Sequence, residues 1–491
     1  MQALTLIKPK HSASRVISIG TSVLIWSVTS LIMKSANANI GESFGFGSRS
    51  AGLMGASVTG GYEGYASYAN PAALSLSRDR RLVVSWGLLS MSPQFTPIRD
   101  IIVENETTSD EVHRGDVTHN YRATLGQSVG VSYLVAPEWM NFALGVTTFV
   151  PIQQFAYVDT GEIYIPEYVL YRARTQRPQF ELAASFMPVE GLHIGAGVHI
   201  GFSLTGNANV FIQTSSDKPS TMRFSSSLTP KGSPYLGILF APGHQAGLST
   251  DPNTPLSIGA VVRFPLESQA NIILNSGARV FGSFAGVDFA FTSRSALYYD
   301  PLSIEIGARL KLFDRWTTQV QLDYQAWQDF VPPALTLQEP SANCSNADAS
   351  ACGINVSGSN NPVPTFKNIL IPRIAQELQI SDAWSIRAAY ARNPGMIDQT
   401  KSDLSEAGNL LDPPKHMISL GIGRQFAQFF GHAIPIRVDA HASAHLLETQ
   451  TITKNPGDEL GNGSGDLKIG APGYQAGGKI LGGGVSLSLA F

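Results

Sequence analysis

Strict alternation of apolar and polar residues is the clearest pattern along the chain. In PLSIEIGARLKL, apolar side chains from Leu302 to Leu312 alternate with polar residues or glycine. Successive side chains of a β-strand point to opposite faces of the sheet, so this segment predicts a strand with one apolar and one polar face. The pattern recurs in WTTQVQLDYQAW, IPIRVDAHASAHL and LHIGAGVHIGFSL. An all-β structure is therefore expected.

Fourteen segments are predicted to be strands. They are residues 81–91, 127–135, 139–150, 177–187, 192–204, 231–241, 255–265, 301–312, 316–327, 366–379, 384–392, 415–427, 434–447 and 480–491. Short connections such as VEG, FDR and SDA alternate regularly with much longer segments. Residues 268–292 also contain strand-like stretches, which we assign to an extracellular hairpin. If they were wall strands, the count would change.

Two architectures can accommodate a β-sheet that has one apolar face and one polar face. A soluble antiparallel sandwich buries that face, whereas a membrane barrel turns it to lipid and keeps the polar face in its lumen. An even strand number, with short turns at one end and long loops at the other, is typical of outer-membrane barrels. The pattern therefore favours a 14-stranded antiparallel transmembrane β-barrel.

The first 38 residues predict a signal peptide. A basic stretch, KPKHSASR, precedes the apolar run VISIGTSVLIWSVTSLIM, and Ala36 to Ala38 form a small-residue cleavage site. An uncleaved anchor is the alternative, but Lys34 and the cleavage site favour removal near Ala38. After this leader no apolar run is long enough for a membrane helix.

Charge and cysteine content narrow the possible partners. Removing the leader's four basic residues lowers Lys+Arg from 34 to 30 against 37 acidic residues, a balance of −7 that argues against nucleic acid. Cys344 and Cys352 lie in a polar, turn-rich segment, which in an exported protein predicts a local disulfide. A metal pair is the weaker alternative because further ligands are missing nearby. No metal or cofactor is expected.

The C-terminal strand supports the barrel. VSLSLAF alternates apolar and polar residues and ends on Phe491, as in chains that the bacterial barrel-assembly machinery inserts. We therefore expect that machinery, outer-membrane lipid and lipopolysaccharide as partners, and a monomeric protein.

Several motifs, in their order, resemble the FadL family of outer-membrane transporters of long-chain fatty acids and other hydrophobic compounds. They are GFGSRSAGLMGASVTGG, YANPAAL, IEIGARLKLFDRWTTQVQLDYQAW and DAWSIRAAYARNPGMIDQTKSD. The resemblance covers about residues 41–491. It implies an N-terminal hatch of residues 39–80 inside a barrel of residues 81–491, with Asn70, Pro71 and Ala72 as the hatch tripeptide.

The family resemblance also implies passive transport. A hydrophobic compound would be captured among extracellular loops and pass to a pocket beside the hatch. Hatch movement and a sideways gap at a kinked third strand would then release it, and Pro151 is the candidate for this kink because proline cannot donate to a sheet ladder. Long-chain fatty acids are the first expected substrate and aromatic hydrocarbons the second.

Candidate substrate contacts come from the hatch and from one loop. The hatch aromatics are Phe44, Phe46, Tyr62, Tyr65 and Tyr68. The loop candidates are Ile163, Tyr164, Tyr168 and Leu170, with Arg172 or Arg174 as a partner for a carboxylate. An upper aromatic girdle or packing within the loop is an equal alternative for the loop residues.

The polar face of the predicted strands carries charged residues, histidines and a serine that suggest further roles. Glu181, Glu305, Arg309, Asp323, Arg387, Arg437 and Asp439 are predicted to form a polar network that braces wall and hatch. Asp439, His441, Ser443 and His445 share one strand face, but residues two apart on a strand are roughly 6.6 Å apart along its axis, too far for a Ser–His relay. We therefore expect no enzyme. A passive porin and a structural or adhesive barrel remain alternatives.

Overall fold

The structure is a computed structural model. It describes residues 46–60, 63–76, 81–105, 112–117, 121, 123–136, 140–152, 165–168, 178–213, 221–242, 256–279, 287–313, 315–330, 334–338, 365–397, 409–428, 434–454 and 469–491. The predicted signal peptide lies outside these residues, as do both cysteines.

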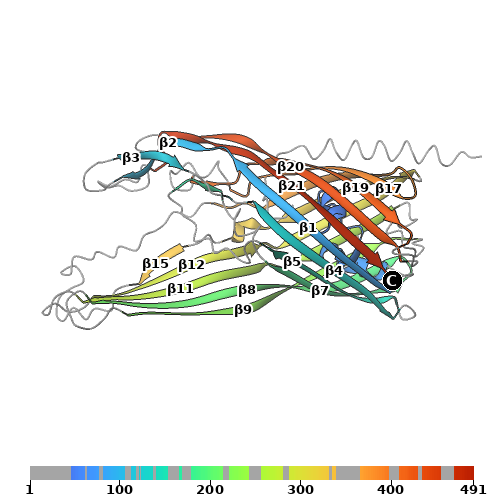
Figure 1. The fold of residues 1–491 in the computed structure, drawn as a ribbon, viewed down its shortest axis with the longest axis horizontal. Helices are drawn as coiled ribbons and strands as arrows, with labels where there is room; N and C mark the ends of the chain where they lie inside the picture. Colours follow the sequence, from blue (N-terminus) through green and yellow to red (C-terminus); the bar gives the residue numbers. More distant parts are fainter. Residues whose placement is uncertain are drawn as a thin grey trace, which may run out of the picture. The chain divides into compact units, whose positions relative to one another are not determined.

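Within the described ranges, fourteen antiparallel strands form a closed ring (Figure 1). In ring order they are β1 (Leu82–Phe95), β4 (Thr124–Ala136), β5 (Phe142–Pro151), β7 (Gln179–Val189), β8 (Leu192–Gln213), β9 (Thr221–Phe240), β10 (Leu256–Arg263), β13 (Ser303–Phe313), β14 (Trp316–Gln325), β16 (Ile369–Gln379), β17 (Trp384–Asn393), β19 (Lys415–Phe426), β20 (Ile436–Thr453) and β21 (Gly473–Ala490). The first strand closes the ring by pairing with the last, with Val83 opposite Ala490. The predicted strand number and architecture are confirmed.

Further strands lie outside the ring. They are β2 (Ile98–Asn105), β3 (Val112–Val117), β6 (Glu167–Tyr168), β11 (Leu266–Arg279), β12 (Val287–Asp300), β15 (Ala334–Gln338) and β18 (Leu410–Leu411). Strands β11 and β12 pair with each other, and β11 also pairs in parallel with the part of β8 that continues beyond the ring. The described parts of the segment 268–292 are therefore a strand pair outside the wall, as predicted, and their extracellular position stays a prediction.

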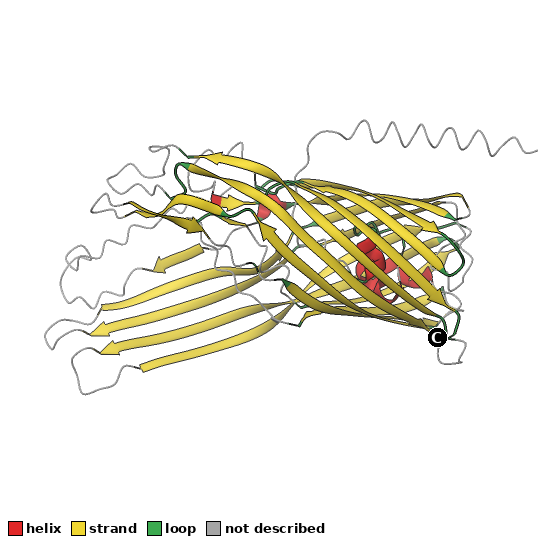
Figure 2. Ribbon diagram, turned by 45° about the horizontal axis from the view of Figure 1, so that its top comes forward, coloured by secondary structure: helices red, strands yellow, loops and turns green. Residues whose placement is uncertain are grey.

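The two ends of the barrel differ. The C-terminal residue and the short connections lie at one end, here called the turn end, and the hairpins lie at the other, here called the loop end (Figures 1 and 2). Strands β8 and β9 are longer than predicted because they continue beyond the ring at the loop end.

The wall carries its apolar residues outside and its polar residues inside. On β19, Leu420 is 61% exposed, whereas its neighbour Ser419 is 1% exposed and faces the lumen. Apolar side chains on other strands, such as Leu236, Ile306 and Val485, are likewise exposed. A soluble sandwich would bury this face, so the burial pattern identifies a transmembrane barrel. Among the described residues, no helix is long and apolar enough to cross a membrane.

Residues 46–60 and 63–76, here together called the lumenal segment, lie inside the ring as short helical turns (Figure 2). These turns are α2 (Ser48–Gly52), η2 (Glu63–Tyr65), α3 (Ala66–Ala69) and η3 (Pro71–Leu76). Positive φ angles at Gly47 and Gly55 bracket α2, and the extended Asn70 before Pro71 ends α3. The segment therefore changes direction several times and reaches wall strands on several sides of the lumen, including β7, β8, β19 and β20.

The outward apolar face makes a testable prediction. Leu420→Arg should lower the free energy of unfolding by about 2–4 kcal/mol, because the charge would enter lipid near the middle of a wall strand. Urea unfolding in phospholipid vesicles measures this, with Leu420→Ala as the control that shortens the side chain without adding charge. Equal stability of the two variants would contradict a lipid-facing position.

Candidate functional site in the barrel lumen

The Asn70 side chain ties the lumenal segment to itself and to the wall. Its amide nitrogen donates to the Val58 carbonyl at 2.7 Å and to the Ile238 carbonyl of β9 at 3.2 Å. Its side-chain oxygen accepts from the Ala72 backbone at 3.0 Å. Asn70 is fully buried, so these bonds satisfy groups that have no access to bulk water.

Glycines of the wall make room for the tripeptide Asn70-Pro71-Ala72 and for the neighbouring Val58. A Cβ atom on Gly237 would lie 2.8 Å from the Pro71 ring, and one on Gly195 would lie 2.7 Å from the Pro71 carbonyl oxygen. A Cβ on Gly259 would collide with the Val58 backbone. The three glycines lie on β8, β9 and β10, so the wall is shaped to let the backbone of the lumenal segment approach closely.

A buried ion network joins the lumenal segment to the opposite side of the wall. Arg49 of α2 pairs with Glu377 of β16 at 2.9 Å. Arg387 pairs with Glu377 at 2.8 Å and with Asp439 at 2.7 Å, and Arg437 pairs with Asp439 at 2.9 Å. Three guanidinium groups therefore share two carboxylates. Arg387, Arg437 and Asp439 belong to the polar network predicted from the sequence.

Two further arginines hold backbone carbonyls of the lumenal segment. Arg263 of β10 pairs with Glu305 at 3.0 Å and donates to the Tyr68 carbonyl. Arg373 of β16 pairs with Asp323 at 2.6 Å and donates to the Met54 carbonyl at 2.6 Å. Each arginine thus connects a wall carboxylate with the lumenal backbone, which supports the segment at two more points.

The strands on both sides of the β1–β21 seam also contact the lumenal segment. The Gly64 backbone donates to the Ser85 hydroxyl of β1 at 2.9 Å, and the Ser48 backbone donates to the Ser486 hydroxyl of β21 at 3.0 Å. Ser85 and Ser488 share a hydrogen bond of 2.7 Å across the seam itself.

Three predicted hatch aromatics meet in one cluster. Phe46 packs on Tyr68 with ring centroids 4.1 Å apart and lies 6.4 Å from the ring of Tyr65. Phe149 of β5 contacts Phe46 edge-on at 6.3 Å. Together with apolar residues toward the loop end, these rings form what we call the aromatic cluster. Its fully or mostly buried members are Phe46, Tyr65, Leu89, Met91, Ile98, Ile101, Phe149, Tyr168, Leu411, Leu447, Tyr474, Ala476 and Ile480.

Tyr168 closes the loop end of the aromatic cluster. Its ring stacks on Phe95 at 4.0 Å, and β6, which contains it, pairs with β18. Its hydroxyl donates to the Gly477 carbonyl at 3.0 Å and accepts from the Gly477 backbone at 2.9 Å. Burial raises the pKa of Tyr168 to about 12, so this hydroxyl stays protonated at neutral pH. Of the predicted loop candidates, Tyr168 is the one within the described residues.

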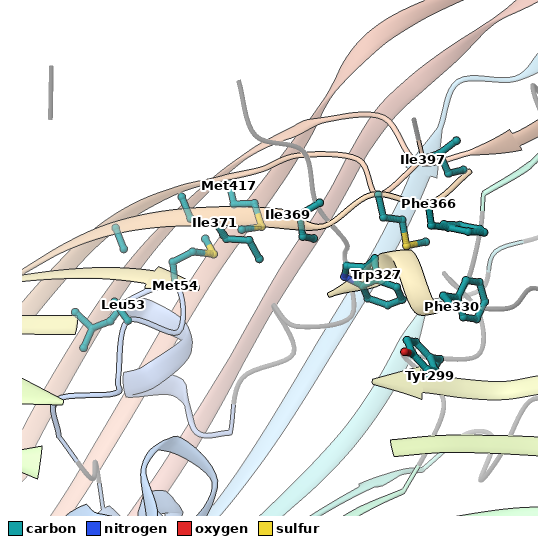
Figure 3. Packing of buried hydrophobic residues seen from close by; sticks show 14 of the residues in the cluster. Leu53, Met54, Tyr299, Trp327, Phe330, Phe366, Ile369, Ile371, Ile397 and Met417 are labelled. Carbon is teal, nitrogen blue, oxygen red and sulfur yellow. The ribbon is translucent and has the colours of Figure 1, made fainter. Parts of the chain in front are cut away.

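A second apolar cluster includes residues of β16, β17 and β19 (Figure 3). It begins at Leu53 and Met54 of the lumenal segment and continues along Ile371 and Ile369. It ends at Trp327, Phe330 and Tyr299, whose rings contact one another at 5.2–6.0 Å. We call this the tryptophan cluster. Both apolar clusters therefore reach from residues outside the wall strands to the lumenal segment.

A cavity open to solvent, here called the polar cavity because most of its lining side chains are polar, lies between the lumenal segment and the wall strands from β7 to β16 in ring order. Charged side chains lining it include Arg263, Asp300, Glu305, Asp323 and Arg373. Tyr68 lines this cavity and also packs against the aromatic cluster, so it contacts both the polar space and the apolar one.

Several predicted site residues lie outside the described residues. They are Phe44, Tyr62, Ile163, Tyr164, Leu170, Arg172, Arg174, Cys344 and Cys352. Pro151 is the last residue of β5 and remains in the ladder opposite Gly126, with no register shift at that point. The kink there stays a prediction. Within the described ranges, no group of three or more His, Cys, Asp or Glu side chains is placed to hold a metal ion.

The sequence did not predict which wall residues contact the lumenal segment. Arg49, Glu377 and Arg373 were not singled out, and neither were Gly195, Gly237 and Gly259. The glycines did carry a signal, because each interrupts a lumen-facing row of an otherwise well-formed strand.

The chain was compared with protein-family models, with characterised proteins and with solved structures. No protein-family model matches the chain. Alkane uptake protein A of Marinobacter nauticus is 21% identical over 480 residues, covering 94% of this chain and 96% of that protein.

One solved structure with a similar fold is that of a FadL homologue. A Pseudomonas aeruginosa FadL homologue has a TM-score of 0.52 at 12% identity, covering 93% of this chain and 99% of that one. The P. putida toluene transporter TodX has a TM-score of 0.48 at 14% identity, covering 91% and 99%. Two of these proteins are named for uptake or transport, alkane uptake protein A and TodX. The chain has the fold of the FadL-type transporters, the family that its sequence resembles.

Proposed function

We propose that the chain is an outer-membrane protein for the passive uptake of hydrophobic compounds, and that the lumenal segment is its hatch. The observation that carries this proposal is the pair of apolar clusters, each of which joins the loop end to the lumenal segment. A water-filled pore would need neither cluster, and a purely structural barrel has no use for apolar surface inside a polar lumen.

The apolar residues support a route for the compound. It would first contact apolar side chains at the loop end, then replace protein contacts in the aromatic cluster, where Phe46 and Tyr68 pack together. Transfer from water to such surface is favourable in proportion to the apolar area removed from water. Movement of the hatch would then release the compound, because Phe46 and Tyr68 belong to the hatch itself.

The hatch contacts differ on its two sides. Asn70 and the wall glycines hold one side by neutral hydrogen bonds and close packing. Arg49 holds the other side by an ion pair. The two attachments use different wall strands, β8–β10 and β16, so the hatch can loosen at one of them while its other contacts keep it inside the barrel.

We propose compounds with long alkyl chains as the substrates. Similarity to a protein named for alkane uptake supports alkanes, and the family resemblance supports long-chain fatty acids. The two classes share the alkyl chain that apolar clusters bind, and differ in the carboxylate. Aromatic hydrocarbons are the alternative class.

The protein is proposed to reach the outer membrane by its signal peptide and to insert through its C-terminal strand. The turn end would then face the periplasm and the loop end the cell exterior. This orientation places both apolar clusters on the side from which a compound arrives.

Uptake by whole cells tests the substrate. A bacterium without its own outer-membrane fatty-acid transporter would express the protein and receive radiolabelled oleic acid or hexadecane in separate experiments. We expect the protein to increase uptake of at least one, and Asn70→Ala to reduce that increase several-fold. Loss of the Asn70 amide leaves buried carbonyls unpaired, at about 1–3 kcal/mol for each orphaned group, which disturbs the hatch.

The matched control is Asn368→Ala. Asn368 is another hydrogen-bonded asparagine, but it contacts Gln328 at the loop end, outside the hatch. It should leave uptake unchanged at equal surface amounts. If correctly assembled protein increases uptake of neither compound, the proposed substrate class is wrong.

The ion network gives a second prediction. Glu377→Gln should lower the free energy of unfolding by about 3–5 kcal/mol, because Arg49 would lose its carboxylate partner and three guanidinium groups would be left with one carboxylate, Asp439. Arg49→Gln should cost clearly less, since two arginines would remain with two carboxylates. Urea unfolding in vesicles compares the two variants, and a larger loss for Arg49→Gln would show that the charge balance does not govern the network.

A further inference from the structure

An arginine lies on the outer face of the wall near the turn end, away from the lumen. Arg424 of β19 is exposed, and its guanidinium carbon lies 4.9 Å from the ring centre of Trp384 on β17. The same carbon lies 4.5 Å from the ring centre of Phe426 on its own strand. Two aromatic rings therefore orient this one cation on the outer surface.

The ladder explains why these groups meet. Trp384 is directly opposite Arg424 in the β17–β19 pairing, and Phe426 follows two residues later on the same face. Cation–π contact stabilises a guanidinium over an aromatic face, by an amount that increases as water is excluded. The arginine is thus held in one place, although its side chain is long.

Within the described part of the chain, the Arg424 guanidinium contacts these two aromatic rings and has no ion pair or hydrogen bond. Other arginines near the turn end do have carboxylate partners: Arg315 approaches Asp382 at 4.0 Å, and Arg437 pairs with Asp439 at 2.9 Å. On its other side, Arg424 lies opposite Val438 of β20, an exposed apolar residue. The positive charge of Arg424 is therefore available to pair with an anionic group outside the protein.

The position of Arg424 matches the edge of the lipid-facing surface. The next outward pair toward the loop end is Ile386 with Ile422, and the one after is Ala388 with Leu420. In the other direction the chain reaches the turn that joins β16 and β17, where the Gln425 backbone bonds to the Ala383 carbonyl. An aromatic-flanked cation at the boundary of an apolar belt lies at the depth of lipid head groups.

From this charge complementarity and from the continuity with the lipid-facing belt, we propose that Arg424, held between Trp384 and Phe426, binds the phosphate group of a membrane phospholipid. A guanidinium can donate two parallel hydrogen bonds to phosphate oxygens, and the lipid's acyl chains would lie along Ile422 and Leu420. This site is on the opposite face of the wall from the proposed uptake route and does not depend on it.

The test compares two lipids that differ in the phosphate. The purified full-length protein in detergent would be titrated with dioleoyl phosphatidylglycerol or with dioleoylglycerol, and native mass spectrometry would count the bound lipids. We expect the wild type to retain the phospholipid in excess, and Arg424→Gln to reduce that excess about fivefold, the factor that corresponds to roughly 1 kcal/mol per basic side chain at an anionic lipid surface.

Two further variants separate charge from packing. Phe426→Leu keeps the cation but removes one ring, so it should weaken phospholipid retention less than Arg424→Gln does. Arg315→Gln removes a cation at the same end of the barrel that already has Asp382 as a partner, and it should leave retention unchanged.

The result that overturns the proposal is an unchanged phospholipid excess in folded Arg424→Gln. Equal retention of the two lipids by the wild type would also overturn it, because the rings would then serve only to pack the arginine. Heat-shifted migration on a gel identifies the folded barrel in every variant.

Discussion

A barrel that is apolar outside must enclose its polar face, and every polar group in that enclosure needs a partner. Buried polar groups without partners are costly, and the cost rises for charges. In this chain much of the lumen is filled by a segment of the chain itself, whose backbone and side chains bond to wall residues from β1 round to β21. The hydrogen bonds of Asn70, the ion pair of Arg49 and the carbonyls held by Arg263 and Arg373 all follow from this need.

The same constraint limits where apolar contacts can form. The aromatic cluster and the tryptophan cluster are two separate groups of buried side chains, and a polar cavity lies against the wall strands from β7 to β16 in ring order. Tyr68 takes part in both kinds of surface, since its carbonyl is held by Arg263 while its ring packs on Phe46. A movement of Tyr68 would therefore change the apolar packing and the polar cavity together.

The alternation of apolar and polar residues was enough to predict the strands of the wall, because this period of two is visible within a few neighbouring residues. It predicted the ring strands, the hairpin at 268–292, and the enclosed position of Asn70 through a family resemblance. It was not enough for the contacts that hold the lumenal segment. Arg49 and Glu377 are 328 positions apart, and whether they meet depends on the register around the whole ring. The role of the glycines at 195, 237 and 259 depends on the fold as well, because they make room for the lumenal segment only when their three strands lie side by side.

The seam between β1 and β21 has a consequence for the order of assembly. The lumenal segment precedes β1 in the chain, and β21 is the last strand, so the ring stays open until the final residues pair with the beginning of the wall. Gly64 and Ser48 contact the two strands at this seam from inside. The segment that fills the lumen therefore contacts both edges of the seam, and it is in a position to act as a template on which those two edges join.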